Sequence, residues 1–498
     1  APRFWNVSAS RRPSASLLSS SVAMCPPADN NRAVVVVDPL STGATISARI
    51  VDRGYEVIRL WSSDCPADLR THTSPDAKDC FAVTLEHDGG MGVDALEVTA
   101  QALHKLPYHI EAIICGSEPG VTLTDALAEH MGMRGNGTEL GHVRRHKFNQ
   151  SEAVRAAGQR AVRQVLAKSV YEACAFVTDF PQPFRAIVKP VESAGSEDVH
   201  LCHSVEDVAK HVGAVLGKVN ALGAVNEAVL VQEFLAGTEY IVDFVSRDGV
   251  HKCTAVWAYD KRPANGGSFV YFGQRPLSIE SAVARDLIQY TRRVIEALGI
   301  RNGATHSEVI VDAEGSPCLV ECNCRAQGGN GEWVPVIEPL SGYSQVSALI
   351  DAFLDGPAFD ALPSEPQPFN GFGMLCFLVS YKEGTLVSSP GMTQLRQLRS
   401  HLGSALEVKE GARLVKTINV FTELGMATLL HEDPEAVEAD YVRLHELCLD
   451  DNFLTVEEDG PEVSAAEGKA PGPESISDVA LSRDPTHLEY ELVSTLPQ

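Results

Sequence analysis

The sequence predicts a parallel α/β domain at the N-terminus, followed by α+β regions built on antiparallel strands. Residues 33–61, "AVVVVDPLSTGATISARIVDRGYEVIRLW", read as a buried strand, a small-residue turn, an amphipathic helix and a second strand. Residues 228–261 alternate apolar and polar side chains about an Asp248-Gly249 turn, which is typical of antiparallel strands. A second hairpin pattern occupies residues 305–325.

The N-terminal pattern repeats once. Residues 111–133 again give a strand, a turn at Gly116 and a helix, and parallel strands require such crossover helices. The turn glycines could cradle a phosphate, but the G-x-G-x-x-G pattern of dinucleotide-binding folds is absent. We therefore expect a small open α/β domain over residues 31–140.

The rest of the chain divides by pattern and composition. Residues 146–170 and 281–298 are expected to be helical, and residues 371–455 mix strands with helices. A C-terminal α+β region is therefore expected over residues 361–458. The remaining residues 459–498 are rich in Glu, Pro, Gly and Ser, a composition that predicts a disordered tail.

Bulk composition limits the class of protein. The chain has 498 residues, 44% of them hydrophobic and 21% charged, with a net charge of -25. That length predicts two or three domains. The negative charge argues against nucleic-acid partners and anionic membrane surfaces, and no apolar run approaches the roughly 18 residues of a membrane span. We expect a cytoplasmic enzyme or binding protein acting on small molecules.

The first residues allow several interpretations. Residues 1–24 contain no acid and are rich in Ser and Arg, which resembles an organelle transit peptide. Because no initiator methionine begins the sequence, a fragment or an untranslated leader before Met24 are alternatives. Residues 1–30 are expected to form a leader outside the folded domains.

Twelve cysteines are spaced irregularly without a C-x-x-C pair, which predicts reduced thiols in an intracellular compartment. Cys318, Cys322 and Cys324 could suggest a metal site. In a strand, however, Cys322 and Cys324 point to the face opposite Glu321 and Arg325. Buried structural thiols are therefore the preferred interpretation.

Acidic residues interrupt the apolar strands of "THSEVIVDAEGSPCLVECNCRAQGG", residues 305–329. Glu308 and Glu321 flank the "AEGS" turn and can share one face of a hairpin. Isolated carboxylates on a half-buried sheet are costly, whereas Mg²⁺ prefers such oxygen ligands. Asn323 adds a neutral oxygen and Arg325 a fork for phosphate or carboxylate. A solvated face or ion pair would explain one acid, but the whole set favours metal–phosphate binding.

A metal–phosphate site also needs upstream cations. Lys189 ends the strand "AIVKP" and precedes a loop with Ser193, Gly195 and Ser196, whose amides could cover a phosphate. Lys147 begins a predicted helix. Each lysine is a weak signal by itself, and their order relative to the acidic strands carries the prediction.

This ordered set resembles the ATP-grasp superfamily, specifically its carboxylate–amine ligases, with the dipeptide-forming L-amino-acid ligases closest in appearance. The resemblance spans roughly residues 33–450 and depends most on "IVKPVESAGSEDV" and the 305–329 block. It implies an N-terminal α/β (Rossmann-like) domain, an ATP-grasp domain over residues 141–360 composed of α+β subdomains, and the C-terminal α+β region.

The resemblance also implies roles. Two lysines bind phosphates, a glycine-rich loop covers them, a hinge presents backbone groups to adenine, an acid binds ribose, and an arginine steadies the acyl phosphate. By match, the lysines are Lys147 and Lys189, and the loop residues are Ser193, Gly195 and Ser196. The hinge matches Gln232, Glu233 and Leu235, the ribose acid is Glu239, and the arginine is Arg325. Glu308, Glu321 and Asn323 match the magnesium ligands.

Some features depart from this pattern or stay open. The loop "ESAGSED" is acidic at both ends. His306 shares a face with Glu308 and is either a catalytic contact to substrate or phosphate, or a hydrogen-bonded core histidine. Lys261 and Arg262 belong to either a flap over the site or an exposed hairpin turn. The sequence identifies no general base.

The predicted function is ATP-dependent ligation of a carboxylate, of the amino-acid class, to an amine through an acyl phosphate. Expected cofactors are ATP and Mg²⁺, with Mn²⁺ as an alternative, and a homodimer is the usual assembly for such enzymes. Two other functions stay open: a kinase-like phosphotransferase and a non-catalytic nucleotide-binding regulator.

Overall fold

The computed structural model describes residues 31–67, 69–72, 80–191, 198–220 and 225–457. The predicted leader before residue 31 and the predicted tail over residues 459–498 lie outside these ranges. Within the described part of the chain, no helix combines the length and apolarity that a membrane crossing requires.

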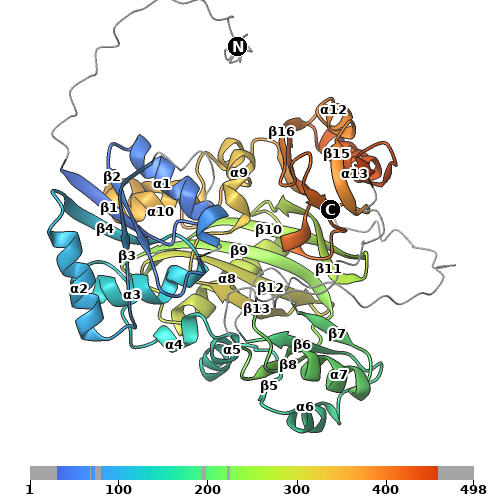
Figure 1. Ribbon diagram of the computed structural model, residues 1–498, viewed down its shortest axis with the longest axis horizontal. Helices are drawn as coiled ribbons and strands as arrows, with labels where there is room; N and C mark the ends of the chain where they lie inside the picture. Colours follow the sequence, from blue (N-terminus) through green and yellow to red (C-terminus); the bar gives the residue numbers. More distant parts are fainter. Residues whose placement is uncertain (1–30, 68, 73–79, 192–197, 221–224, 458–498) are drawn as a thin grey trace, which may run out of the picture. The chain divides into compact units, whose positions relative to one another are not determined.

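The N-terminal unit is a parallel four-stranded sheet in the order β3-β2-β1-β4 (Figure 1). Its elements are β1 (Arg32–Val37), α1 (Thr42–Asp52), β2 (Glu56–Trp61), β3 (Phe81–Glu86), α2 (Val93–His104), β4 (His109–Cys115) and α3 (Val121–His130). The predicted β-α-β unit and second cycle are confirmed, whereas the edge strand β3 and helix α2 were not predicted. Gly43 and Gly116 serve close packing, because a Cβ on Gly43 would lie 2.6 Å from the Gly116 carbonyl oxygen.

A second sheet holds four strands in the order β5-β8-β6-β7. Its strands are β5 (Gln164–Ala167), β6 (Ala186–Pro190), β7 (His200–Cys202) and β8 (Val229–Glu233), with helices α6 (Val170–Val177) and α7 (Val205–Val215) packed on it. The helix predicted over residues 146–170 is wrong in its second half. Helix α5 (Lys147–Ala156) stops before Gly158, whose φ of 75° breaks the helical path, and β5 follows.

The largest sheet has eight strands in the order β13-β12-β9-β10-β11-β14-β18-β16. These are β9 (Gly237–Arg247), β10 (Val250–Ala264), β11 (Gly267–Pro276), β12 (Gly303–Asp312), β13 (Pro317–Asn323), β14 (Phe372–Leu378), β16 (His401–Leu406) and β18 (Gly425–His431). The predicted turns at Asp248-Gly249 and at "AEGS" join β9 to β10 and β12 to β13. The C-terminal strands extend this sheet, because Gly273 of β11 pairs with Cys376 of β14.

Helices cover the large sheet. One helix is α8 (Ala282–Ala297), close to the prediction, and it packs with Phe244 and Val256. Two more are α9 (Val334–Ser341) and α10 (Gln345–Leu354). The C-terminal strands are covered by α12 (Gly391–Leu395) and α13 (Pro434–Leu449). A small separate sheet consists of β15 (Gly384–Ser388), β17 (Arg413–Leu414) and β19 (Thr455–Glu457).

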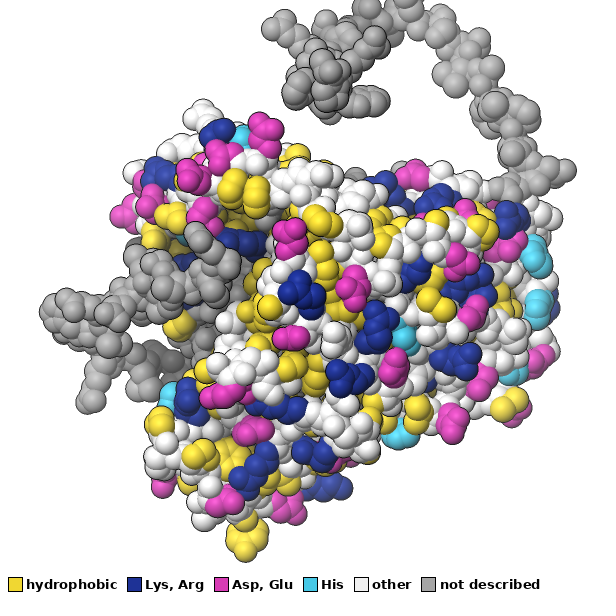
Figure 2. All heavy atoms as spheres, turned by 180° about the vertical axis from the view of Figure 1, so that it is seen from behind, with side chains coloured by type: hydrophobic (Ala, Val, Ile, Leu, Met, Phe, Trp, Pro, Cys, Tyr) yellow, Lys and Arg dark blue, Asp and Glu magenta, His cyan; other side chains and the backbone are white. Residues whose placement is uncertain are grey.

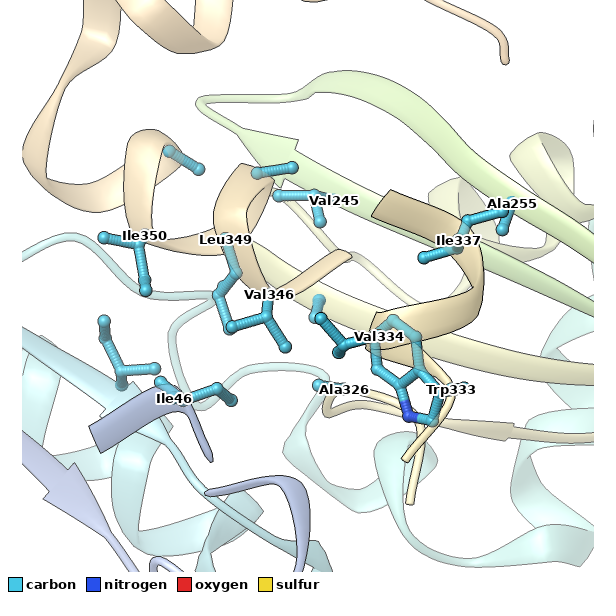
Figure 3. Close-up of a cluster of buried hydrophobic side chains, with 14 of the residues drawn as sticks. Ile46, Val245, Ala255, Ala326, Trp333, Val334, Ile337, Val346, Leu349 and Ile350 are labelled. Carbon is cyan, nitrogen blue, oxygen red and sulfur yellow. The ribbon is translucent and has the colours of Figure 1, made fainter. Parts of the chain in front are cut away.

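A shared core joins the N-terminal unit to the large sheet. Ile46 of α1 faces Val346 and Leu349 of α10, and Trp333 packs in the same cluster (Figure 3). Because α10 also packs against β9, burial of this apolar surface holds the two sheets in one arrangement. On the surface, basic and acidic side chains are interspersed over the face seen in Figure 2.

Candidate active site

Two acidic side chains meet on neighbouring strands of the large sheet. Glu308 of β12 is the register partner of Glu321 of β13, and His306 is the partner of Asn323. Directly opposed residues of antiparallel strands place their Cβ atoms about 5 Å apart on one face. The hairpin therefore brings together the predicted metal ligands, as the "AEGS" turn indicated.

Both predicted phosphate-binding lysines lie close to these acids. Lys147 begins α5, whose N-terminal amide at Asn149 is capped by the His146 ring, and its Nζ lies 2.6 Å from Glu321 Oε2. Burial works against the charge of Lys147, but the attraction of Glu321 outweighs it and raises the pKa of that lysine. Lys189 of β6 is 5% exposed, and its burial lowers its pKa to about 8 although Glu321 attracts the charge.

Glu239, the predicted ribose acid, lies on β9 and pairs with Lys261 of β10 at 2.6 Å. The Lys261 ammonium also sits 4.4 Å from the ring centres of both Tyr259 and Tyr271. With only 10% of its side chain exposed, Lys261 belongs to the buried site and not to an exposed hairpin turn. Burial raises the pKa of Glu239, while Lys261 and His306 hold the pKa of Glu308 below its usual range despite burial.

The predicted adenine hinge covers the last two residues of β8 and the connection that follows them. The Gln232 side chain donates to Gln164 Oε1 at 2.9 Å, and Glu233 Oε1 accepts from the Arg163 amide at 2.7 Å. Leu235 lies half-buried in the connection to β9. Because their side chains are anchored by neighbouring strands, Gln232 and Glu233 hold the hinge backbone in a defined position. The predicted loop residues Ser193, Gly195 and Ser196 lie outside the described residues.

His306 occupies a buried hydrogen-bonded position. Its Nδ1 lies 3.0 Å from Asp243 Oδ1, its Nε2 lies 3.7 Å from Glu308 Oε1, and Trp257 Nε1 donates to Asp243 Oδ2 at 3.0 Å. Burial alone would lower the pKa of His306, but Asp243 and Glu308 raise it to about 9. Asp243 therefore holds the His306 ring beside Glu308.

Arg325 joins the N-terminal unit to the site. Its Nε lies 3.3 Å from Glu118 Oε2, and Arg145 Nε lies 3.9 Å from the other oxygen of Glu118. Arg145 in turn pairs with Asp64 at 3.0 Å. Sequence reasoning missed Glu118 and Arg145, because only the fold brings the loop after β4 to the end of β13. The "GSEPG" turn after a buried strand was the available signal for Glu118.

Gln150 was also missed, and it supports the strand that carries the predicted metal ligands Glu321 and Asn323. The β13 strand is the edge of the large sheet, so its outer peptide groups need other partners. Gln150 is 3% exposed; its Oε1 accepts from the Cys322 amide at 3.0 Å and its Nε2 donates to the Cys322 carbonyl at 2.7 Å. Cys322 separates Glu321 from Asn323, so Gln150 positions both.

The donor set suits a hard divalent cation. Two carboxylates are opposed in register, and Asn323 Nδ2 donates to Glu321 Oε1 at 3.3 Å. The Asn323 Oδ1 is the oxygen of that amide that could face a cation. The nearby thiols Cys322 and Cys324 are buried with the apolar side chains beneath the strand. The oxygen ligands thus face the site and the thiols face the core.

Known proteins resemble this chain in sequence and in fold. A family model described as the ATP-grasp domain matches residues 182–333. This stretch resembles the ATP-grasp domain. The predicted resemblance to ATP-grasp carboxylate–amine ligases is confirmed. Over 370 residues, 73% of this chain and 83% of the relative, it is 29% identical to dapdiamide A synthase of Enterobacter agglomerans.

Other similar proteins are also ligases. Alanine–anticapsin ligase of Bacillus subtilis (strain 168) is 25% identical over 269 residues, which cover 51% of this chain and 56% of the relative. The crystal structure of L-amino acid ligase from Bacillus licheniformis superposes with a TM-score of 0.67 at 16% identity, covering 87% of this chain and all of that one. The ATP-grasp fold therefore extends over most of the described chain.

Proposed function

We propose that this protein uses ATP to join a carboxylate of the amino-acid class to an amine, releasing ADP and phosphate. The observation that carries the proposal is the convergence of Lys147 and Lys189 with the register pair Glu308 and Glu321. Such a set neutralises the terminal phosphates of a nucleotide and positions one of them for transfer. The ligase names of the relatives support the same chemistry.

Each residue has a proposed role. Mg²⁺ held by Glu308, Glu321 and Asn323 would supply charge neutralisation at the phosphates, with Mn²⁺ as a substitute to be tested. Lys147 and Lys189 bind the same phosphates from α5 and β6. Glu239 offers two acceptors for ribose hydroxyls, and the backbone of the hinge at Glu233 and Leu235 meets the adenine edge. His306 orients Glu308.

The reaction we propose has two steps. A carboxylate oxygen attacks the γ-phosphorus, the bond to the β–γ bridging oxygen breaks, and ADP leaves. The amine nitrogen then attacks the acyl carbonyl, the bond from carbon to the phosphate oxygen breaks, and the nitrogen loses a proton. Arg325 steadies the departing phosphate, and Glu118 beside it makes the N-terminal, Rossmann-like domain a contributor to the substrate site.

The test is an ATP-consumption screen over pairs of amino acids, with mass spectrometry of the products. Hydroxylamine offered with the carboxylate substrate alone should trap a hydroxamate in step with ADP. Glu321→Gln serves as the inactive control. AMP as the first nucleotide product would overturn the proposal, and a stable phosphorylated product formed at full rate without amine would favour the kinase-like alternative.

We also propose a homodimer, the usual assembly of such ligases. Light scattering of the full chain tests it: a monomer mass across micromolar concentrations would contradict this proposal and leave the ligase chemistry untouched.

A further inference from the structure

A cavity of about 480 Å³ has a wall that includes none of the predicted site residues. Its wall is made by the segment after α3, the turn joining β9 to β10, and the C-terminal end of α8. The polar residues that matter for its chemistry are Asn136, Glu139, Arg144, His251, Glu296 and Arg301. Its volume is that of an ordinary small-molecule site.

The wall offers both charge signs to a ligand. Glu139 and Glu296 are exposed acids, and Arg301 is an exposed base. His251 is 8% exposed, and its Nδ1 is held 2.7 Å from Ser246 Oγ, which leaves Nε2 as its nitrogen for a ligand. A ligand with one ammonium and one carboxylate would find a partner for each group here.

The floor of the cavity is rigidly built. Arg144 is 1% exposed, and its guanidinium bonds Asp125 at 2.7 Å and the carbonyl oxygens of Asn136 and Gly137. Asn136 Oδ1 accepts from the backbone amide of Arg301 at 2.8 Å. Because the charge of Arg144 is already balanced by Asp125, Arg301 is the guanidinium open to a ligand.

The same floor is connected to the active site. The Arg144 carbonyl accepts from Gln150 Nε2 at 2.9 Å, and Gln150 also clamps Cys322 between two metal-site residues. Along the chain, Arg145 follows directly and Lys147 begins the next helix. The Arg144 side chain therefore lies in the cavity floor, while the Arg144 carbonyl is linked through Gln150 to the strand of Glu321.

We propose that this cavity is a second binding site for a small zwitterion of the amino-acid or short-peptide class, and that its occupancy controls the placement of Lys147. Arg301 binds the carboxylate, and Glu139 and Glu296 bind the ammonium. A ligand on Arg301 is linked to this segment through Asn136, whose Oδ1 accepts from the Arg301 amide and whose carbonyl accepts from Arg144. The binding step uses only the chemistry of the wall, whereas the effect on Lys147 rests on the proposed function.

Calorimetric titration of the full chain with alanyl-alanine, in saturating ADP and Mg²⁺, tests the site without turnover. Arg301→Ala should weaken binding at least about tenfold. Arg325→Ala in the active site and Arg293→Ala, an exposed arginine of α8 outside the cavity wall, should leave this binding event unchanged. N-acetylated and C-amidated alanyl-alanine should each bind at least about tenfold more weakly, because each lacks one charge.

The second readout is coupling. Alanyl-alanine should slow hydrogen exchange over residues 141–150 and change the KM for ATP in the native chain, and Arg301→Ala should abolish both effects. Loss of binding in Arg325→Ala with retention in Arg301→Ala would place the peptide only in the active site and overturn the proposal. Absence of any binding up to millimolar peptide would overturn it as well.

Discussion

Gln150 gives the sharpest test of how this site is held. Gln150→Ala removes the side-chain partners of the Cys322 amide, the Cys322 carbonyl and the Arg144 carbonyl, all around a residue that is 3% exposed. A buried peptide group left without a partner costs about 1–3 kcal/mol. Since the Arg144 carbonyl keeps the Cys324 thiol as a donor at 3.5 Å, we expect a total loss of about 3 kcal/mol of unfolding free energy.

The effect on catalysis should exceed that of a general loss of stability. Cys322 lies between Glu321 and Asn323, so release of its backbone loosens two metal ligands together. Displacement of such groups by about 1 Å costs about 100-fold in rate. We expect kcat to fall about 10- to 100-fold and the Mg²⁺ concentration for half-maximal rate to rise, with partial recovery at high Mg²⁺.

The assays are urea unfolding followed by tryptophan fluorescence, and ATP consumption with amine at varied Mg²⁺. Gln150→Glu should be no better than Gln150→Ala, because it places a carboxylate against two carbonyl oxygens. Gln101→Ala, which removes an exposed hydrogen bond to Glu97, should change stability by under about 0.5 kcal/mol. Native kcat and an unchanged Mg²⁺ requirement in Gln150→Ala would refute the reasoning.

Three further changes test the charges of the protein. Glu321→Gln should lower turnover by about 100-fold or more, while the melting temperature of the variant stays close to that of the native chain. Near-native activity of this variant would remove the metal-site assignment. Lys261→Met should destabilise the chain by about 3 kcal/mol and abolish turnover, because Glu239 is left buried without its cation. Lys261→Arg keeps the cation and should fold stably. Equal stability of the two variants would contradict the pairing of Lys261 with Glu239. Burial, with the charge of Glu407 beside it, raises the pKa of Glu423 to about 8, so native stability should fall as pH rises from about 4.5 to 8. Glu423→Gln should remove that slope and add about 1–3 kcal/mol at pH 8 in urea titrations, and an unchanged slope would show that this group is ionised at neutral pH.

Local pattern was enough to predict the metal hairpin. Strand periodicity places Glu308, Glu321, Asn323 and Arg325 on chosen faces, and the four-residue turn sets which of them oppose each other. These are short-range consequences of covalent geometry, so they could be predicted from the sequence. The same holds for the β-α-β unit of the N-terminal sheet, whose crossover helix lies between its strands in the chain.

The partners of those residues depended on the tertiary structure. Glu118 reaches Arg325 from a loop about two hundred residues away in the chain, Gln150 reaches Cys322 from α5, and Lys261 turns into the site only because β10 pairs beside β9. No periodicity encodes such contacts, because they depend on how separate sheets pack over one shared core. The sequence therefore determined which chemical groups the site contains, and tertiary packing decided which cation neutralises each acid and what positions the metal-site strand.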